Sequence, residues 1–394
     1  MPVRITRRQL GLAAAAASTA ASAMAQNDAS APKYGGPLEG FETKVEMKDF
    51  DPVAYSMERY RHAPLKLTFQ AQNRQETLAW QKKLRAKLVE LIGGFPANGP
   101  LKSKTLEVKE FPEYRRERFI FESRPGVGVL GYLVTPKSAK GPVPTVVCIP
   151  GHGRGVDDIV GIDEHGKERA EKPFYEFDFA LQVAGHGMAA LAIEPMAFGC
   201  RRNDITAKKG AGASACQPVA GAALLLGETM IGWRTYDVMR AIDWIETRPE
   251  LDAKRVGCMG ISGGGTITTF ASALDPRIKT AFISGYLNTF RDSIASLSHC
   301  IDNYVPGILN WAELYDVAGL IAPRPLIAES GDHDPIFPLH GSRESFARVK
   351  KVYEAMGAAD VIEHDVFPGV HQFSGRKGIP FVAKALEAYS SEIR

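Results

Sequence analysis

A serine flanked by glycines follows a short apolar run near residue 260. The run Val256–Gly260 has the pattern of a buried strand and Gly263–Ala273 that of a helix, which puts Ser262 at a strand-to-helix turn. Glycines on both sides let neighbouring backbone pack closely where a side chain would collide. We therefore predict that Ser262 is a nucleophile, with the N–H of Gly263 and the start of the helix facing a developing oxyanion. The alternative is a glycine-rich turn that binds phosphate or nothing.

A serine hydroxyl becomes a good nucleophile only when a base takes its proton, and His371 is the predicted base. It lies between the last predicted strand, Val361–Phe367, and the predicted terminal helix, Pro380–Ser390. This position fits the chain order of serine, acid and histidine that accompanies such a serine turn. The alternative is a histidine on a surface loop.

The acid that orients this histidine is predicted in the loop after the strand Pro325–Ala328. Two aspartates compete there, and Asp334 is favoured because it stands in a Gly-x-x-Asp loop with a proline four residues later. Asp332 remains the alternative acid. If Asp334 is the acid, Asp332 is expected to form a turn by hydrogen bonding to its own backbone.

A second oxyanion donor is predicted in the glycine-rich loop that follows the strand Thr145–Ile149. The backbone N–H of His152 is the candidate, and its imidazole either lines the pocket or has no direct role. Glu194 ends a strand at the expected catalytic edge, where it either faces the pocket or tethers a loop. Aromatic rings in or beside the long insertions are expected either to stack on sugar faces or to pack in the core, and they belong to Trp233, Tyr304 and Trp311.

Short apolar runs alternate with helical stretches over most of the chain. This alternation predicts an α/β fold with a mostly parallel central sheet flanked by helices. An antiparallel pair, Arg118–Glu122 with Leu130–Thr135, is expected at one edge, and an amphipathic helix, Gln75–Ile92, in an N-terminal helical extension. The other expected strands and helices are Ala189–Ile193, Thr280–Ser284, Phe177–Ala184, Thr235–Glu246 and Ser342–Ala355.

Three intervals are too long to be plain connections between these elements. Long irregular segments in compact domains are usually lids or pocket walls. We therefore expect substrate contacts in the long loop insertions Gly153–Lys172, Ala197–Thr229 and Gly285–Ile321.

The N-terminus has the basic, apolar and small-residue segments of a signal peptide, and Arg7-Arg8 resembles a twin-arginine export signal. A plain Sec signal is the alternative, and an uncleaved span is disfavoured because the apolar run is shorter than the ~20 residues that a membrane requires. The product is expected to be periplasmic or secreted. The predicted segments are a signal peptide (1–25), a linker (26–40), an N-terminal extension (41–115) and a catalytic domain (116–394).

The charge of the chain bears on which partners it binds, and its cysteine content bears on whether it forms disulfides. The chain has 48 basic and 45 acidic residues, and three of the basic residues are arginines of the predicted signal peptide. Without them the mature chain has 45 basic and 45 acidic residues and is expected to be formally neutral. We expect no nucleic-acid partner, and no membrane partner once the signal is removed. The five cysteines contain no C-x-x-C pair, and Cys200 with Cys216 is the expected pairing if a disulfide forms.

We expect no cofactor and no metal. His152 and the histidines and aspartates near residues 160 and 333 are ligand types, but they lack a tight metal-binding spacing such as H-E-x-x-H. The expected partner is a small-molecule or carbohydrate ester substrate, and the oligomeric state is left open.

Several motifs of the chain occur together in one known family: Pro150–Gly153, Gly260–Gly264, Asn303–Gly307, Ile321–Leu326, and the loops of Asp334 and His371. On these motifs, and over roughly residues 40 to 390, the chain resembles the acetyl xylan esterase-like branch of the α/β hydrolases, which is related to dienelactone hydrolases and prolyl oligopeptidases. This resemblance implies cofactor-free deacetylation of carbohydrate esters by a serine esterase. Pro150 departs from it, since relatives commonly carry histidine there, and dienelactone hydrolases proper use cysteine where this chain has Ser262.

Two other functions remain open. A serine peptidase of prolyl-oligopeptidase type would use the same triad, but the N-terminal part is too short for the propeller domain that usually precedes such a hydrolase. A non-catalytic carbohydrate-binding protein on a hydrolase scaffold would have no need for all three residues of the triad.

Overall fold

The computed structural model describes residues 36–169 and 175–391. The predicted signal peptide and most of the predicted linker therefore lie outside the described residues. The chain divides into two units, one ending at Ala54 and the other beginning at Tyr55. The first contains the short 3₁₀ helix η1 (Met47–Phe50), and helix α2 (Pro52–Arg61) spans the boundary. The predicted boundaries of the extension and the catalytic domain remain predictions.

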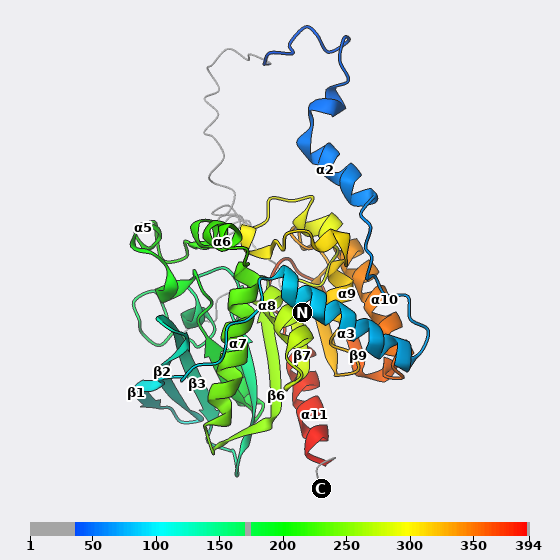
Figure 1. Cartoon of the computed structure of the whole chain (residues 1–394). Helices are drawn as coiled ribbons and strands as arrows, with labels where there is room; N and C mark the ends of the chain where they lie inside the picture. The colour runs from blue at the N-terminus through cyan, green and yellow to red at the C-terminus, as the bar shows by residue number, and fades with distance from the viewer. Residues whose placement is uncertain (1–35, 170–174, 392–394) are drawn as a thin grey trace, which may run out of the picture. The chain divides into compact units, whose positions relative to one another are not determined.

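The second unit contains a nine-stranded sheet in the order β1-β2-β3-β5-β4-β6-β7-β8-β9 (Figure 1). Strands β4 to β9 run parallel, whereas β1, β2 and β3 form an antiparallel edge that joins β5. This confirms the predicted mostly parallel sheet with an antiparallel edge. The strands are β1 (Lys104–Glu110), β2 (Tyr114–Arg124), β3 (Val127–Pro136), β4 (Val143–Ile149), β5 (Ala189–Ile193), β6 (Leu251–Ile261), β7 (Ile278–Ser284), β8 (Leu326–Gly331) and β9 (Ile362–Phe367).

Helices cover both faces of this sheet. Successive strand residues point to opposite faces, so in β4 Val146 and Cys148 pack with α4 and α11, whereas Val147 and Ile149 pack with α7 and α8. Helices α3 and α10 bury their apolar residues with β7 and β8 in a further cluster. Burial on both faces explains why the central strands are continuous apolar runs. These helices are α3 (Arg74–Leu91), α4 (Phe179–Gly185), α7 (Met230–Glu246), α8 (Gly263–Leu274), α10 (Leu339–Ala355) and α11 (Gly378–Ser391).

The insertions contain short helices that the sequence patterns did not predict. Two lie between β5 and α7, and one lies between β7 and β8. Strand β1 was also missed, because its charged residues are mostly exposed and give no apolar pattern. No helix within 36–169 or 175–391 is both long and apolar enough to span a membrane. The unpredicted helices are α5 (Asp204–Ala207), α6 (Cys216–Leu225) and α9 (Leu314–Gly319).

Helix α3 offers a matched test of its own packing with β7 and β8. Leu84 is 1% exposed in the cluster shared with β7 and β8, whereas Leu78 on the same helix is 48% exposed. Leu84→Ala should lower the free energy of unfolding by about 2–5 kcal/mol, because it leaves a cavity. Leu78→Ala should change it by less than about 0.5 kcal/mol. Urea titration measures both, and equal effects would contradict the described packing.

Candidate active site

Ser262 is the single residue between strand β6 and helix α8. Its backbone has φ 54° and ψ −118°, a conformation that residues other than glycine rarely adopt. A Cβ atom on Gly264 would lie 2.0 Å from the carbonyl oxygen of Ile149, and one on Gly260 would lie 2.6 Å from the Gly264 backbone. Both glycines are therefore required. Because α8 begins immediately after the serine, its first N–H groups have no acceptor within the helix and are available to an anion.

His371 and Asp334 are brought together although 37 residues separate them. The imidazole Nδ1 lies 2.7 Å from Oδ2 of Asp334. The other carboxylate oxygen accepts the N–H groups of Ile336, at 2.8 Å, and Phe337, at 3.0 Å, which fixes the carboxylate. The Asp334 side chain is 1% exposed. Of the two aspartates considered from the sequence, Asp334 is thus the one that contacts the histidine.

Asp332 instead joins two loops. Its Oδ1 accepts the N–H of Gly369 at 2.9 Å, and the N–H of His333 donates to the carbonyl of Gly369 at 2.9 Å. The hydrogen bond from Gly369 is the main cause that lowers the pKa of Asp332. The loops that carry Asp334 and His371 are therefore bonded directly to each other.

The imidazole of His371 is enclosed by rings. Its centroid lies 5.5 Å from that of Phe337 and 5.7 Å from that of Tyr175. A Cβ atom on Gly285 would lie 3.2 Å from the imidazole Cε1, so a side chain there would crowd the ring. The Nε2 atom is buried and has no hydrogen-bond partner among the described residues. This nitrogen therefore makes no hydrogen bond with the Ser262 hydroxyl or with any other described residue.

Tyr175 is a site residue that the sequence analysis missed. Burial is the main cause that raises the pKa of its phenol, and hydrogen bonding with the Ser262 side chain acts in the opposite direction. Its hydroxyl oxygen lies 2.1 Å from the position that a Cβ atom on Gly151 would occupy. The phenol thus lies against both the serine and the glycine-rich loop. No motif marks this tyrosine, which stands between a long insertion and the predicted start of a helix.

The two predicted oxyanion donors, His152 and Gly263, are neighbours. A Cβ atom on Gly263 would lie 3.1 Å from Nδ1 of His152. A residue from another segment holds the loop of His152 in place, because the Glu176 carboxylate accepts the N–H of Gly151 at 2.6 Å. The loop after β4 therefore lies beside the first turn of α8.

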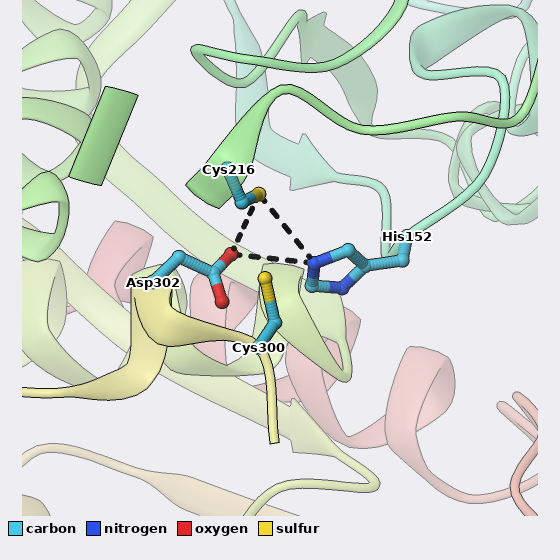
Figure 2. Close-up of side chains that lie close together, drawn as sticks. All are labelled: His152, Cys216, Cys300 and Asp302. Atoms are coloured by element: carbon cyan, nitrogen blue, oxygen red, sulfur yellow. Dashed lines mark hydrogen bonds and ion pairs between the residues drawn. The ribbon is translucent and has the colours of Figure 1, made fainter. Parts of the chain in front are cut away.

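His152 also belongs to a polar cluster with Cys216, Cys300 and Asp302, shown in Figure 2. The histidine Nε2 lies 3.4 Å from Oδ2 of Asp302 and 3.7 Å from Sγ of Cys216. The predicted pairing of Cys216 with Cys200 is wrong. Both thiols are free, Cys200 is exposed, and Cys216 is buried in this cluster.

Arg234 is buried against the same cluster. Its guanidinium pairs with Asp302, and its Nη2 lies 3.3 Å from Sγ of Cys216. The pKa of Cys216 is lowered, chiefly by a hydrogen bond from the Cys300 thiol and further by the Arg234 cation. Burial acts to raise the pKa of Asp302, but His152 and Arg234 outweigh it and hold that pKa at about 2.

Of the four residues that the sequence placed near a pocket, only Tyr304 lines the pocket described here, and the other three have other contacts. Tyr304 lines a pocket of about 160 Å³ together with Asn303, the neighbour of Asp302. Glu194 is 2% exposed and accepts the N–H of Val156, so it tethers a loop, and burial raises its pKa to about 8. Cations lie over the two tryptophan rings, Arg124 at 5.9 Å from that of Trp233 and Lys87 at 4.3 Å from that of Trp311.

Glu329 of β8 connects the serine side of the site to the histidine side. Its Oε1 accepts the hydroxyl of Ser284 at 2.6 Å and the N–H of Ser374 at 3.0 Å, and its Oε2 accepts the N–H of Gly375 at 2.9 Å. The carbonyl of Ser284 in turn accepts the N–H of Ser262 at 3.0 Å. Burial raises the pKa of Glu329 from its ordinary 4.5 to about 7.

Comparison with known proteins gives one matching family model and several similar folds. Residues 60–376 match the model described as "Abhydrolase family". The Bacillus subtilis (strain 168) protein "Putative hydrolase YtaP" is 28% identical over 283 residues, which are 70% of this chain and 89% of that protein.

Two solved structures share the fold at low identity. A structure titled as a putative acetyl xylan esterase from Bacteroides fragilis NCTC 9343 is 21% identical, with a TM-score of 0.68 over 81% of this chain and 82% of that one. A glucuronoyl esterase from Solibacter usitatus is 16% identical, with a TM-score of 0.61 over 82% and 97%. The family match and these folds confirm the predicted resemblance to α/β hydrolases.

The pKa of Glu329 predicts a pH dependence of stability. Between pH 4.5 and about 7 the folded chain holds a proton that the unfolded chain releases. The free energy of unfolding contributed by Glu329 is therefore present below this window and is lost as the pH rises through it. Glu329→Gln should reduce this fall in the free energy of unfolding. The variant should nevertheless be less stable than wild type, because an amide NH₂ cannot accept the N–H of Gly375. Urea titrations at pH 5 and pH 8 measure the slope.

The exposed Glu354→Gln is the control for the loss of one carboxylate, and it should keep the wild-type slope. An unchanged slope in Glu329→Gln would contradict the proton assigned to Glu329.

Proposed function

Because the chain belongs to the abhydrolase family, we propose that it is a serine carboxylester hydrolase in which Ser262, Asp334 and His371 form a catalytic triad. One observation carries the proposal. His371 contacts Asp334 through Nδ1 at 2.7 Å, and its Nε2 is buried without a partner among the described residues. An imidazole held in this way by a carboxylate has one nitrogen committed and the other ready to accept a proton.

The proposed reaction has two halves. The Ser262 hydroxyl attacks the ester carbonyl carbon as Nε2 of His371 takes its proton. The N–H groups of Gly263 and His152 then stabilise the oxyanion. His371 next protonates the leaving alcohol, and an acyl-enzyme remains on Ser262. Water attacks this acyl-enzyme by the same route and regenerates the serine.

Asp334 has two roles in this mechanism. It accepts the N–H at Nδ1, which keeps Nε2 as the basic nitrogen of the neutral imidazole. It also stabilises the imidazolium that forms when Nε2 takes the serine proton. Two backbone N–H groups on its other oxygen support these roles, because they hold the carboxylate in one orientation.

We assign the substrate class to carbohydrate esters, with acetyl as the acyl group. Support comes from the similar folds of a protein described as a putative acetyl xylan esterase and of a glucuronoyl esterase. The same proposal includes export by the N-terminal signal to the periplasm or beyond, since xylan and other polymers that carry such esters lie outside the cell.

Replacement of the triad residues tests the proposal. Ser262→Ala should lower kcat by about 10⁶-fold, and Asp334→Asn by about 10⁴-fold because the wrong tautomer is stabilised. Asp332→Asn is the matched control. It keeps an oxygen that can accept the N–H of Gly369 and should retain most of the activity. The measurement is hydrolysis of p-nitrophenyl esters from acetate to octanoate, with a peptide p-nitroanilide to detect peptidase activity.

Near-normal turnover by Ser262→Ala would reject the triad. Failure of Ser262 to react with a fluorophosphonate probe would instead favour a non-catalytic carbohydrate-binding protein. Turnover of long acyl chains by a probe-reactive enzyme would leave the triad intact and reject the acetyl assignment.

A further inference from the structure

We propose that His152, Cys216, Cys300 and Asp302 form a structural zinc site beside the catalytic serine. One donor atom from each residue lies within 4.8 Å of the other three. Figure 2 shows the four side chains pointing toward one another. The set is two thiols, one imidazole and one carboxylate, a combination that favours Zn²⁺ over the harder Mg²⁺ and Ca²⁺. This inference does not depend on the proposed hydrolysis.

The distances agree with tetrahedral coordination. With zinc bonds of about 2.3 Å to sulfur and about 2.0–2.1 Å to nitrogen and oxygen, tetrahedral angles separate sulfur from nitrogen or oxygen by about 3.5 Å and nitrogen from oxygen by about 3.3 Å. The Cys216 Sγ atom lies 3.7 Å from His152 Nε2 and 3.4 Å from Asp302 Oδ2. The nitrogen and oxygen lie 3.4 Å apart. These three donors are therefore close to the positions that a bound zinc ion requires, and the Cys300 thiol lies within 4.8 Å of each of them.

The charges balance when the ion is bound. Zinc takes both cysteines as thiolates, so the ligands bring three negative charges. A Zn²⁺ ion neutralises two of them, and the buried guanidinium of Arg234 neutralises the third through its contacts with Asp302 and Cys216. Arg234 thus acts as a second-shell donor to two ligands rather than as a competitor for the ion.

The ligands are also oriented from behind. Asp302 presents Oδ2, which also accepts the Arg234 guanidinium, to the cluster, while its Oδ1 accepts the amide of Asn303 at 3.0 Å. That Asn303 accepts the hydroxyl of Thr266 on α8 at 2.7 Å. The ring of His152 lies 4.7 Å from that of Phe198, with Nε2 toward the cluster. Such support is typical of residues that bind metal ions.

Four protein ligands complete the coordination of a tetrahedral zinc, so no position remains for water or substrate. The proposed role is therefore structural. Cys216 begins α6 in the insertion after β5, and Cys300 and Asp302 lie in the insertion after β7. A shared ion would join both insertions to the loop of His152, and so fix one oxyanion donor next to Gly263.

The test is the metal content of the whole purified chain. After growth with added zinc and purification without chelators, mass spectrometry of the metals should find about one zinc per chain. Cys300→Ser should lose most of this zinc, whereas Cys200→Ser, which alters an exposed cysteine outside the cluster, should keep it. Replacement of zinc by Co²⁺ should give the thiolate-to-cobalt charge-transfer absorption in wild type and weaken it in Cys300→Ser.

Two results would overturn the proposal. The first is less than about a tenth of a zinc per chain, with both thiols reactive and no cobalt absorption, which would leave the Arg234–Asp302 pair as a metal-free ion pair. The second is a Cys216–Cys300 disulfide in peptides prepared without reduction. Each result is obtained without an activity assay.

Discussion

The close backbone approach at the Ser262 turn is the constraint on which the rest of the site depends. Helix α8 starts so near β4 that a Cβ atom on Gly264 would lie 2.0 Å from the carbonyl of Ile149, and Ser262 itself adopts φ 54°. Strand β6, which ends at this turn, is buried and hydrogen bonded to β4 and β7, and this support offsets the cost of the unusual backbone. The parallel strands then deliver the loops of His152, Asp334 and His371 to the same edge of the sheet.

Much of this arrangement follows from local sequence patterns. The central strands are apolar runs because both of their faces are buried, and a parallel sheet places the ends of such strands together. The glycines beside Ser262, the order of Ser262, Asp334 and His371, and the proline after Asp334 are local signals as well. They sufficed to select the aspartate that contacts the histidine.

The parts that could not be predicted depend on how distant segments pack. His152, Cys216 and Cys300 lie far apart in sequence, and no spacing rule relates them. Sequence proximity favoured pairing Cys216 with Cys200, whereas packing turns Cys216 toward Cys300 and leaves Cys200 exposed. Tyr175 was missed for the same reason, because its place in the site comes from contact with Gly151 and Ser262, which are distant in sequence.

The hydrogen bonds that Asp332 and His333 form with Gly369 join the loops that carry Asp334 and His371. Ser262 lies outside these two loops, between β6 and α8. If Ser262 and His371 act as proposed, their separation depends on how β6 and β7 are held against these two joined loops, and Glu329 contributes to that contact by bonding to Ser284 on one side and to Ser374 on the other.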